Sequence, residues 1–72
     1  MTTGSTYNII ELVGTSEKSW EEAAKLAVET AAKTVRDLRV AEVIQLDMTV
    51  EDGKVKNYRA KVNVSFKYQK EA

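Results

Sequence analysis

Cysteine and histidine are both missing from this sequence. Without cysteine, the chain can form neither a disulfide nor a thiolate metal site. Without histidine, it lacks the commonest general base, the commonest transition-metal ligand and any Ser–His or Cys–His nucleophile pair. The carboxylates are not paired with a nucleophile or an oxyanion site, so we expect a protein that is not an enzyme.

An excess of charge and long apolar runs are also missing. Eleven basic and eleven acidic residues cancel, which gives no indication of a basic patch for nucleic acid. No apolar run is long enough to span a membrane. The opening "MTTGST" has no charged segment followed by an apolar one, as a signal peptide would. We therefore expect a soluble cytoplasmic protein that binds neither nucleic acid nor a membrane.

The 72 residues are enough for one domain, 1–72, in which we expect residues 1–5 to be flexible. A chain this short buries only about 60% of the surface that its unfolded form exposes. Small domains usually compensate with disulfides, a structural metal or association. Since disulfides are excluded, association of copies is the compensation that remains most open.

The first half of the chain predicts a strand and then a helix. Residues 6–14 are rich in β-branched and aromatic residues and end at Gly14, which indicates a strand. In the segment 14–38, Ser19 and Glu22 have the spacing of a capping box, in which the hydroxyl accepts from the amide of residue 22 and the carboxylate bonds to the amide of residue 19. The apolar residues that follow fall three or four apart and are mostly alanine, so the helix should approach its sheet closely. They are Trp20, Ala23, Ala24, Ala27, Ala31, Val35 and Leu38.

The second half predicts a strand over residues 40–50 and another over 55–69. The turn between them, residues 51–54, has Asp52 and Gly53 at the positions that need positive φ angles. The last strand alternates apolar and polar residues and could extend roughly 45–50 Å, whereas a helix of twenty residues is only about 30 Å long. Its uncovered end should therefore contact another subunit. Its apolar face consists of Tyr58, Ala60, Val62, Val64, Phe66 and Tyr68.

Together these elements predict an α+β fold of the order β-α-β-β. A helical crossover returns the second strand in the direction of the first, and the hairpin partner then fits between them, antiparallel to both. We expect a three-stranded antiparallel sheet of order 1-3-2, packed on one helix.

The stretch "RVAEVIQLDM", residues 39–48, is mostly apolar but contains two acidic residues. Strict alternation places Glu42 on the same face as Val40 and Leu46, and Asp47 on the opposite face. A buried carboxylate is costly without a partner, so we expect Glu42 to pair with a basic residue of this chain or of another subunit. Two interpretations of Asp47 remain open. It is either a calcium ligand completed by symmetry mates or backbone carbonyls, or it pairs across strands with a basic residue of the third strand.

Short motifs make the chain resemble the dodecin family. They are "ELVGTS" at 11–16, "AEV" at 41–43 and "VSFK" at 64–67, in an order that spans about residues 6–68. The resemblance implies a hollow homododecamer with cubic symmetry. The stretches "SWE" at 19–21 and "RVAEVIQLDM" are most similar to the calcium dodecin branch, which implies an assembly that can carry Ca²⁺.

Many dodecins bind flavins, and the resemblance also indicates where that site would lie. A tryptophan early in the second strand stacks on the flavin, a glutamine of the third strand bonds to its polar edge, and an arginine follows later in the second strand. The corresponding positions here are Val40, Arg59 and Asp47, and none of the three matches. Valine has no π face, arginine offers donors only, and an aspartate repels a phosphate, so we expect no standard flavin site.

Three functions remain open at this point. The first is a shell that binds or stores small ligands or metal ions, of the calcium dodecin type. The second is a flavin-binding dodecin with an altered pocket, and the third is a purely structural oligomeric shell. Trp20 is either a packing anchor in the first turn of its helix or a platform for an aromatic ligand.

Overall fold

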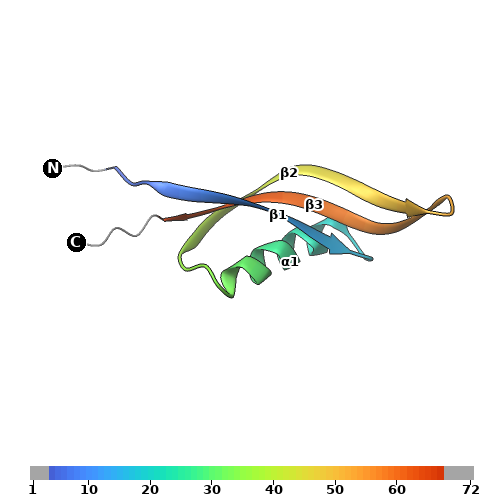
Figure 1. The fold of residues 1–72 in the computed structure, drawn as a ribbon, viewed down its shortest axis with the longest axis horizontal. Coiled ribbons are helices and arrows are strands. Elements are labelled where there is room, and N and C mark those ends of the chain that lie inside the picture. Colours follow the sequence, from blue (N-terminus) through green and yellow to red (C-terminus); the bar gives the residue numbers. More distant parts are fainter. Residues whose placement is uncertain (1–3, 68–72) are drawn as a thin grey trace.

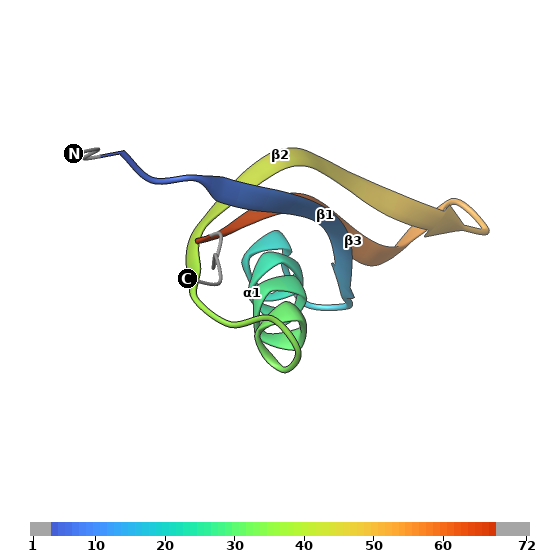
Figure 2. The ribbon, with the colours of Figure 1, turned by 60° about the vertical axis from the view of Figure 1, so that its left-hand side comes forward.

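The computed structural model describes residues 4–67, which form a three-stranded antiparallel sheet with a helix on one of its faces (Figure 1). The order along the chain is β1 (Tyr7–Ser16), α1 (Trp20–Ala32), β2 (Leu38–Glu51) and β3 (Lys54–Lys67). The strands lie in the order β1-β3-β2. The predicted fold class and strand order are therefore confirmed. The chain is elongated, 59 × 20 × 14 Å, and the sheet curves over α1 (Figure 2).

Small residues form the core between α1 and the sheet. The helix buries three alanines, as its apolar spacing predicts, and β3 buries the middle of its predicted apolar face. Because alanine adds little bulk, the helix lies close to the strands. The buried residues are Ala23, Ala27, Ala31, Ala60, Val62 and Val64.

Gly14 is the point of closest approach between β1 and α1. A Cβ atom built on it would lie 2.0 Å from the carbonyl oxygen of Ala23 and 3.0 Å from the Cβ of Ala27. Only glycine fits this space. The prediction that the first strand ends at Gly14 is wrong, because β1 continues to Ser16 and the glycine serves packing rather than a turn.

The predicted cap of α1 is half correct. Ser19 is the N-cap, and its hydroxyl accepts a hydrogen bond from the Glu22 amide at 3.0 Å. The Glu22 carboxylate, however, accepts from the hydroxyl of Ser16. The Ser19 amide donates to Ser16 Oγ at 3.4 Å. Ser16 is buried at the end of β1, so its hydroxyl needs a partner, and the nearby carboxylate fills that role.

The helix is shorter than its apolar spacing indicates. It ends at Ala32, with Lys33 as the C-cap, and the chain then turns through Asp37, whose φ is 60°. Val35 therefore lies in the connection, and Leu38 begins β2. The described helix is too short and too polar to cross a membrane.

The hairpin between β2 and β3 is formed as predicted. Asp52 has a φ of 52° and Gly53 a φ of 74°, which are the values of a two-residue loop with both φ angles positive. The predicted extension of the last strand to residues 68 and 69 lies outside the described residues, as do residues 1–3 of the expected flexible segment.

The part of the sheet that α1 leaves uncovered belongs mainly to β2. The helix packs on β1 and β3 and touches β2 much less. Val43, Leu46 and Met48 of β2 face the helix side of the sheet, yet each is more than 40% exposed. Ala60, Val62 and Val64 in the middle of β3 are completely buried, whereas Val55 near its hairpin end is exposed. The predicted contact of that end with another subunit stays a prediction, and the structure adds an uncovered apolar surface on β2.

Candidate functional site

A bulge in β2 brings its two acidic residues to the same face of the sheet. Val43 pairs with Val62 and Gln45 with Lys61, which leaves Ile44 as an extra residue between them. An extra residue reverses the alternation of the strand that carries it. Glu42, opposite Asn63, and Asp47, opposite Arg59, therefore share the face that points away from α1.

This register corrects the predicted position of Glu42. Its side chain lies on the exposed face rather than on the apolar one. Water solvates an exposed carboxylate, so no desolvation cost calls for a counter-ion. Within residues 4–67 the structure contains no ion pair of Glu42, and the expected pairing with another subunit stays a prediction.

The three positions of the expected flavin site lie on this same face. Val40 is opposite Ser65, and Asp47 is opposite Arg59. Val40 is 58% exposed and offers a small aliphatic surface without a ring. The structure thus brings Val40, Asp47 and Arg59 to one side of the sheet.

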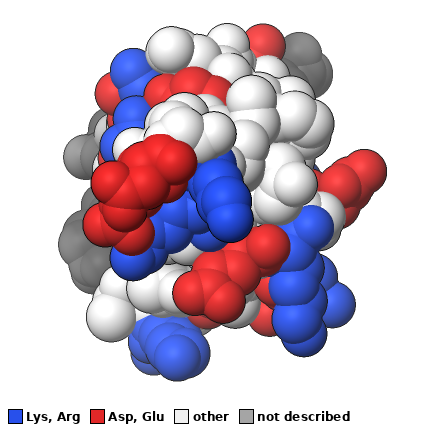
Figure 3. All heavy atoms as spheres, turned by 90° about the vertical axis from the view of Figure 1, so that its right-hand side faces the viewer, with Lys and Arg blue, Asp and Glu red and all other residues white. Residues whose placement is uncertain are grey.

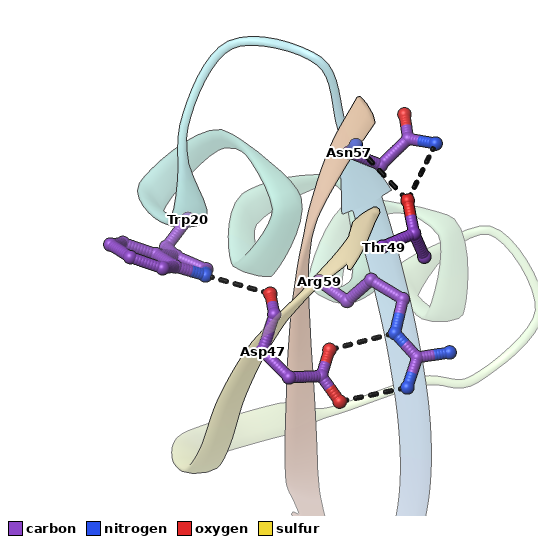
Figure 4. Close-up of polar contacts among 5 residues, drawn as sticks. All are labelled: Trp20, Asp47, Thr49, Asn57 and Arg59. Carbon is purple, nitrogen blue, oxygen red and sulfur yellow. Dashed lines mark hydrogen bonds and ion pairs between the residues drawn. The ribbon is translucent and has the colours of Figure 1, made fainter. Parts of the chain in front are cut away.

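Asp47 and Arg59 form a bidentate ion pair across β2 and β3 (Figure 4). Arg59 Nε donates to Asp47 Oδ1 at 2.7 Å, and Nη2 donates to Oδ2 at 2.8 Å. This fork-to-fork arrangement is the strongest geometry of such a pair. The pairing of Asp47 with a basic residue of the third strand, one of the two interpretations of this residue, is therefore present in the structure.

The ion pair shifts the pKa values of both partners. The hydrogen bonds from Arg59 are the largest influence and lower the pKa of Asp47 below its usual value of 3.8. Desolvation opposes them in part, and the charges of Arg59 and then Lys61 lower the pKa further. The bonds to Asp47 raise the pKa of Arg59 in turn. Both side chains are about 40% exposed, so solvent screens the attraction considerably.

Trp20 connects α1 to the same strand pair. Its indole Nε1–H donates to the backbone carbonyl of Asp47 at 3.0 Å (Figure 4). Its ring meets that of Tyr58 edge to face, with the centroids 5.1 Å apart. Trp20 is a packing anchor, as one of its two interpretations has it. Its bond to Asp47 was not predicted, because the two residues are 27 positions apart and no local pattern joins them.

An apolar groove of about 470 Å³ opens beside Trp20 on the helix side of the sheet. The residues that line it are Trp20, Glu21 and Ala24 of α1 and Val43 and Leu46 of β2. The groove continues the uncovered apolar surface of β2. It offers almost no polar atoms, so it suits packing against an apolar surface better than binding a polar ligand.

The hairpin end carries side chains of both charges (Figure 3). Lys56 Nζ lies 3.2 Å from Glu51 Oε1 in an exposed ion pair. The Thr49 hydroxyl accepts from the amide of Asn57 at 3.1 Å, which ties the two strands together near the turn (Figure 4). These contacts pair opposite charges and hold the two strands together. They do not form a cluster of side chains of one charge that could bind an ion.

The described residues of one chain do not make a complete calcium site. Residues 4–67 contain no group of three or more acidic, histidine or cysteine side chains that could hold a metal. Calcium takes six to eight oxygen ligands. Arg59 already bonds to both carboxylate oxygens of Asp47, and Trp20 bonds to the carbonyl oxygen of the same residue. Asp47 alone therefore supplies few of the oxygens that calcium takes.

Comparison with known proteins gives one consistent result. The family model for Dodecin matches residues 6–69. The calcium dodecin of Mycobacterium tuberculosis is 49% identical over 63 residues, which are 88% of this chain and 89% of that protein.

Solved structures agree with the sequence matches. A dodecin from Streptomyces coelicolor superimposes with a TM-score of 0.89 at 31% identity, over 97% of this chain and all of the other. The M. tuberculosis calcium dodecin, described as having a novel calcium-binding site, superimposes with a TM-score of 0.80 at 48% identity, over 94% and 97% of the two chains.

Proposed function

Because the chain belongs to the dodecin family, we propose that it is a binding or storage protein, without catalysis, that assembles as a hollow homododecamer. Small ligands or metal ions are held where its copies meet. A cytoplasmic location remains a prediction from the sequence.

The exposed apolar surface of the chain is the observation that best supports assembly. A contiguous exposed apolar surface on a soluble chain marks a site of association with another protein surface. Much of the exposed apolar surface lies on β2, where Val43, Leu46 and Met48 point to the helix side and are each more than 40% exposed. A second copy that covers this surface would supply the burial that one chain lacks.

Calcium is the ligand that one relative, the M. tuberculosis calcium dodecin, supports. The M. tuberculosis protein is described as having a calcium-binding site and is about half identical to this chain. Asp47 is the candidate ligand here, with carboxylates or carbonyls of neighbouring copies completing the coordination. One chain supplies too few free oxygens, so the proposal places the ion at a contact between copies.

The side chains at Val40, Asp47 and Arg59 argue against the usual flavin site. Stacking needs a flat ring, and Val40 has none. Asp47 and Arg59 form an ion pair with each other, so neither side chain is free to bind the polar edge or the phosphate of a flavin.

Two measurements test this proposal. Native mass spectrometry should show an assembly of twelve chains, and a stable species of 8.1 kDa would contradict it. Calorimetry on the assembled protein should detect calcium binding and no riboflavin binding. Micromolar riboflavin binding with quenched flavin fluorescence would instead support the altered flavin pocket. Binding of neither ligand by an intact assembly would support the purely structural shell.

A further inference from the structure

We propose that Arg59 controls the access of cations to Asp47, by holding the two carboxylate oxygens that a cation would need. This inference rests on the proposed function only in that Asp47 is its candidate calcium ligand. Arg59 is then the residue of this chain that sets how strongly a cation can bind on the face of the sheet that points away from α1.

The geometry engages every oxygen of Asp47 in one hydrogen bond. The two guanidinium nitrogens lie 2.7 and 2.8 Å from the two carboxylate oxygens. The third oxygen of the residue, its backbone carbonyl, accepts the indole N–H of Trp20 at 3.0 Å. A cation that chelates both carboxylate oxygens would occupy the space of the guanidinium and would also be repelled by its charge. Chelation of a cation by both oxygens and the bidentate pairing with Arg59 therefore exclude each other.

The environment allows Arg59 to leave. Its side chain is 42% exposed, so water can solvate the guanidinium once the pair opens. Asn57 and Lys61, its neighbours on the same face of β3, are only partly buried and form no wall around it. The ion pair is thus a reversible competitor, which lowers cation affinity without abolishing it.

Charge near the pair acts separately from the contact itself. Lys61 lies opposite Gln45 on the same face and acts on Asp47 through its charge without a hydrogen bond. Glu42, also on this face, is exposed and contributes a negative charge. Lys61 therefore provides a matched control, because its removal takes away one positive charge of this face but leaves the bidentate contact intact.

Terbium luminescence can report on this site directly. Tb³⁺ replaces Ca²⁺ at oxygen ligands and emits when a nearby indole transfers energy to it. Trp20 is the only tryptophan of the chain, and its ring is hydrogen-bonded to Asp47. A terbium ion at this carboxylate would therefore be sensitised by Trp20, and added Ca²⁺ would quench the signal by competition.

Arg59→Gln in the assembled protein should bind Tb³⁺ on the order of tenfold more tightly than the unmodified protein, because it loses both the competitor and its charge. Lys61→Gln should change the affinity by about twofold at most at physiological salt. The double variant Arg59→Gln with Asp47→Asn should lose the gain. Equal affinity of Arg59→Gln and the unmodified protein would overturn the inference. So would an equal gain in Lys61→Gln, or a gain that persists in the double variant.

Arg59→Lys keeps the inference testable if the glutamine variant does not assemble. Lysine retains the charge but cannot form the two-pronged contact, so its affinity should lie between those of the other two proteins, and an affinity equal to that of the unmodified protein would count against the inference. Failure of the proposed function looks different. If the unmodified assembly binds no calcium while Arg59→Gln gains terbium at Asp47, the calcium function fails and the control by Arg59 stands.

Discussion

The part of the sheet under α1 and the part that extends past it cover their apolar side chains in different ways. Where α1 lies over β1 and β3 (Figure 2), the centre of the contact consists of alanine, glycine and valine and is buried, with larger, partly buried residues such as Ile10 and Leu12 packed against it. Where β2 and the hairpin extend past the helix, the side chains are larger and exposed, with Leu46 and Met48 as examples (Figure 1). A close contact built from small residues buries its apolar surface within one chain. A surface of large apolar residues needs a second chain to cover it.

The difference shows how a chain of 72 residues divides its apolar surface. A small core buries too little to be stable by itself, and this chain places several of its bulkier apolar residues where β2 extends past the helix. Trp20 lies at the boundary, because it begins the helix and bonds to β2. The two halves should therefore respond differently to substitution.

Gly14 should be the most sensitive position of the covered half. In Gly14→Ala, the new Cβ would overlap the Ala23 carbonyl oxygen, so α1 must move away from β1. We expect a loss of about 3 kcal/mol or more in the free energy of unfolding, measured by urea denaturation followed by circular dichroism. Gly4→Ala is the matched control, because a Cβ there meets nothing within 4 Å. Equal effects of the two substitutions would mean that the close contact does not limit stability.

Leu46 should be the corresponding position of the uncovered half, with an effect on assembly rather than on the fold of one chain. Leu46→Lys places a charge in the groove beside Trp20, where it is tolerated in water but not under a second copy. Sedimentation should show smaller species, while circular dichroism keeps the signal of the fold. Leu46→Met preserves volume and apolarity and should keep the assembly. An intact assembly of Leu46→Lys would show that copies do not cover this groove.

Substitution of Trp20 should show how much its contacts between α1 and β2 contribute to stability. Trp20→Phe keeps an aromatic ring near Tyr58 but removes the donor to the Asp47 carbonyl. We expect a loss of about 1 kcal/mol, the usual value of one hydrogen bond. Trp20→Ala, which also removes the ring, should cost more, about 3 kcal/mol. Urea midpoints at one protein concentration measure both, and a phenylalanine variant as unstable as the alanine variant would contradict the role of the hydrogen bond.

The smallest effect should come from the pH dependence of the Asp47–Arg59 pair. Since Arg59 lowers the pKa of Asp47 below 3.8, the folded state binds the proton less readily than the unfolded state. The stabilisation by the pair is therefore complete above pH 3.8 and disappears as the pH falls through the lower pKa of the folded state. The stability difference between the unmodified protein and Asp47→Asn should narrow over that range in urea titrations. A difference that stays constant with pH would show that the ionised carboxylate does not contribute.

Local patterns predicted much of the fold. The strict alternation of β3, the turn at Asp52 and Gly53, and the cap at Ser19 all depend on residues close in sequence, and the structure contains each of them. The order of elements then leaves few topologies. The site was predicted less completely. A basic partner on the third strand was foreseen for Asp47, but neither its bidentate geometry nor the bond from Trp20 follows from spacing.

What the sequence determined by itself is the set of elements and their order, because periodicity and turn residues act over a few positions. What only the tertiary structure decided is which side chains share a face of β2. The bulge at Ile44 arises from the pairing of β2 with β3, and this one extra residue moves Glu42 from the apolar face to the face of Asp47. The turn at Asp52 and Gly53 sets the register of this hairpin next to the loop. The position of a bulge further along β2 has no local signature, since it depends on how the sheet curves over α1.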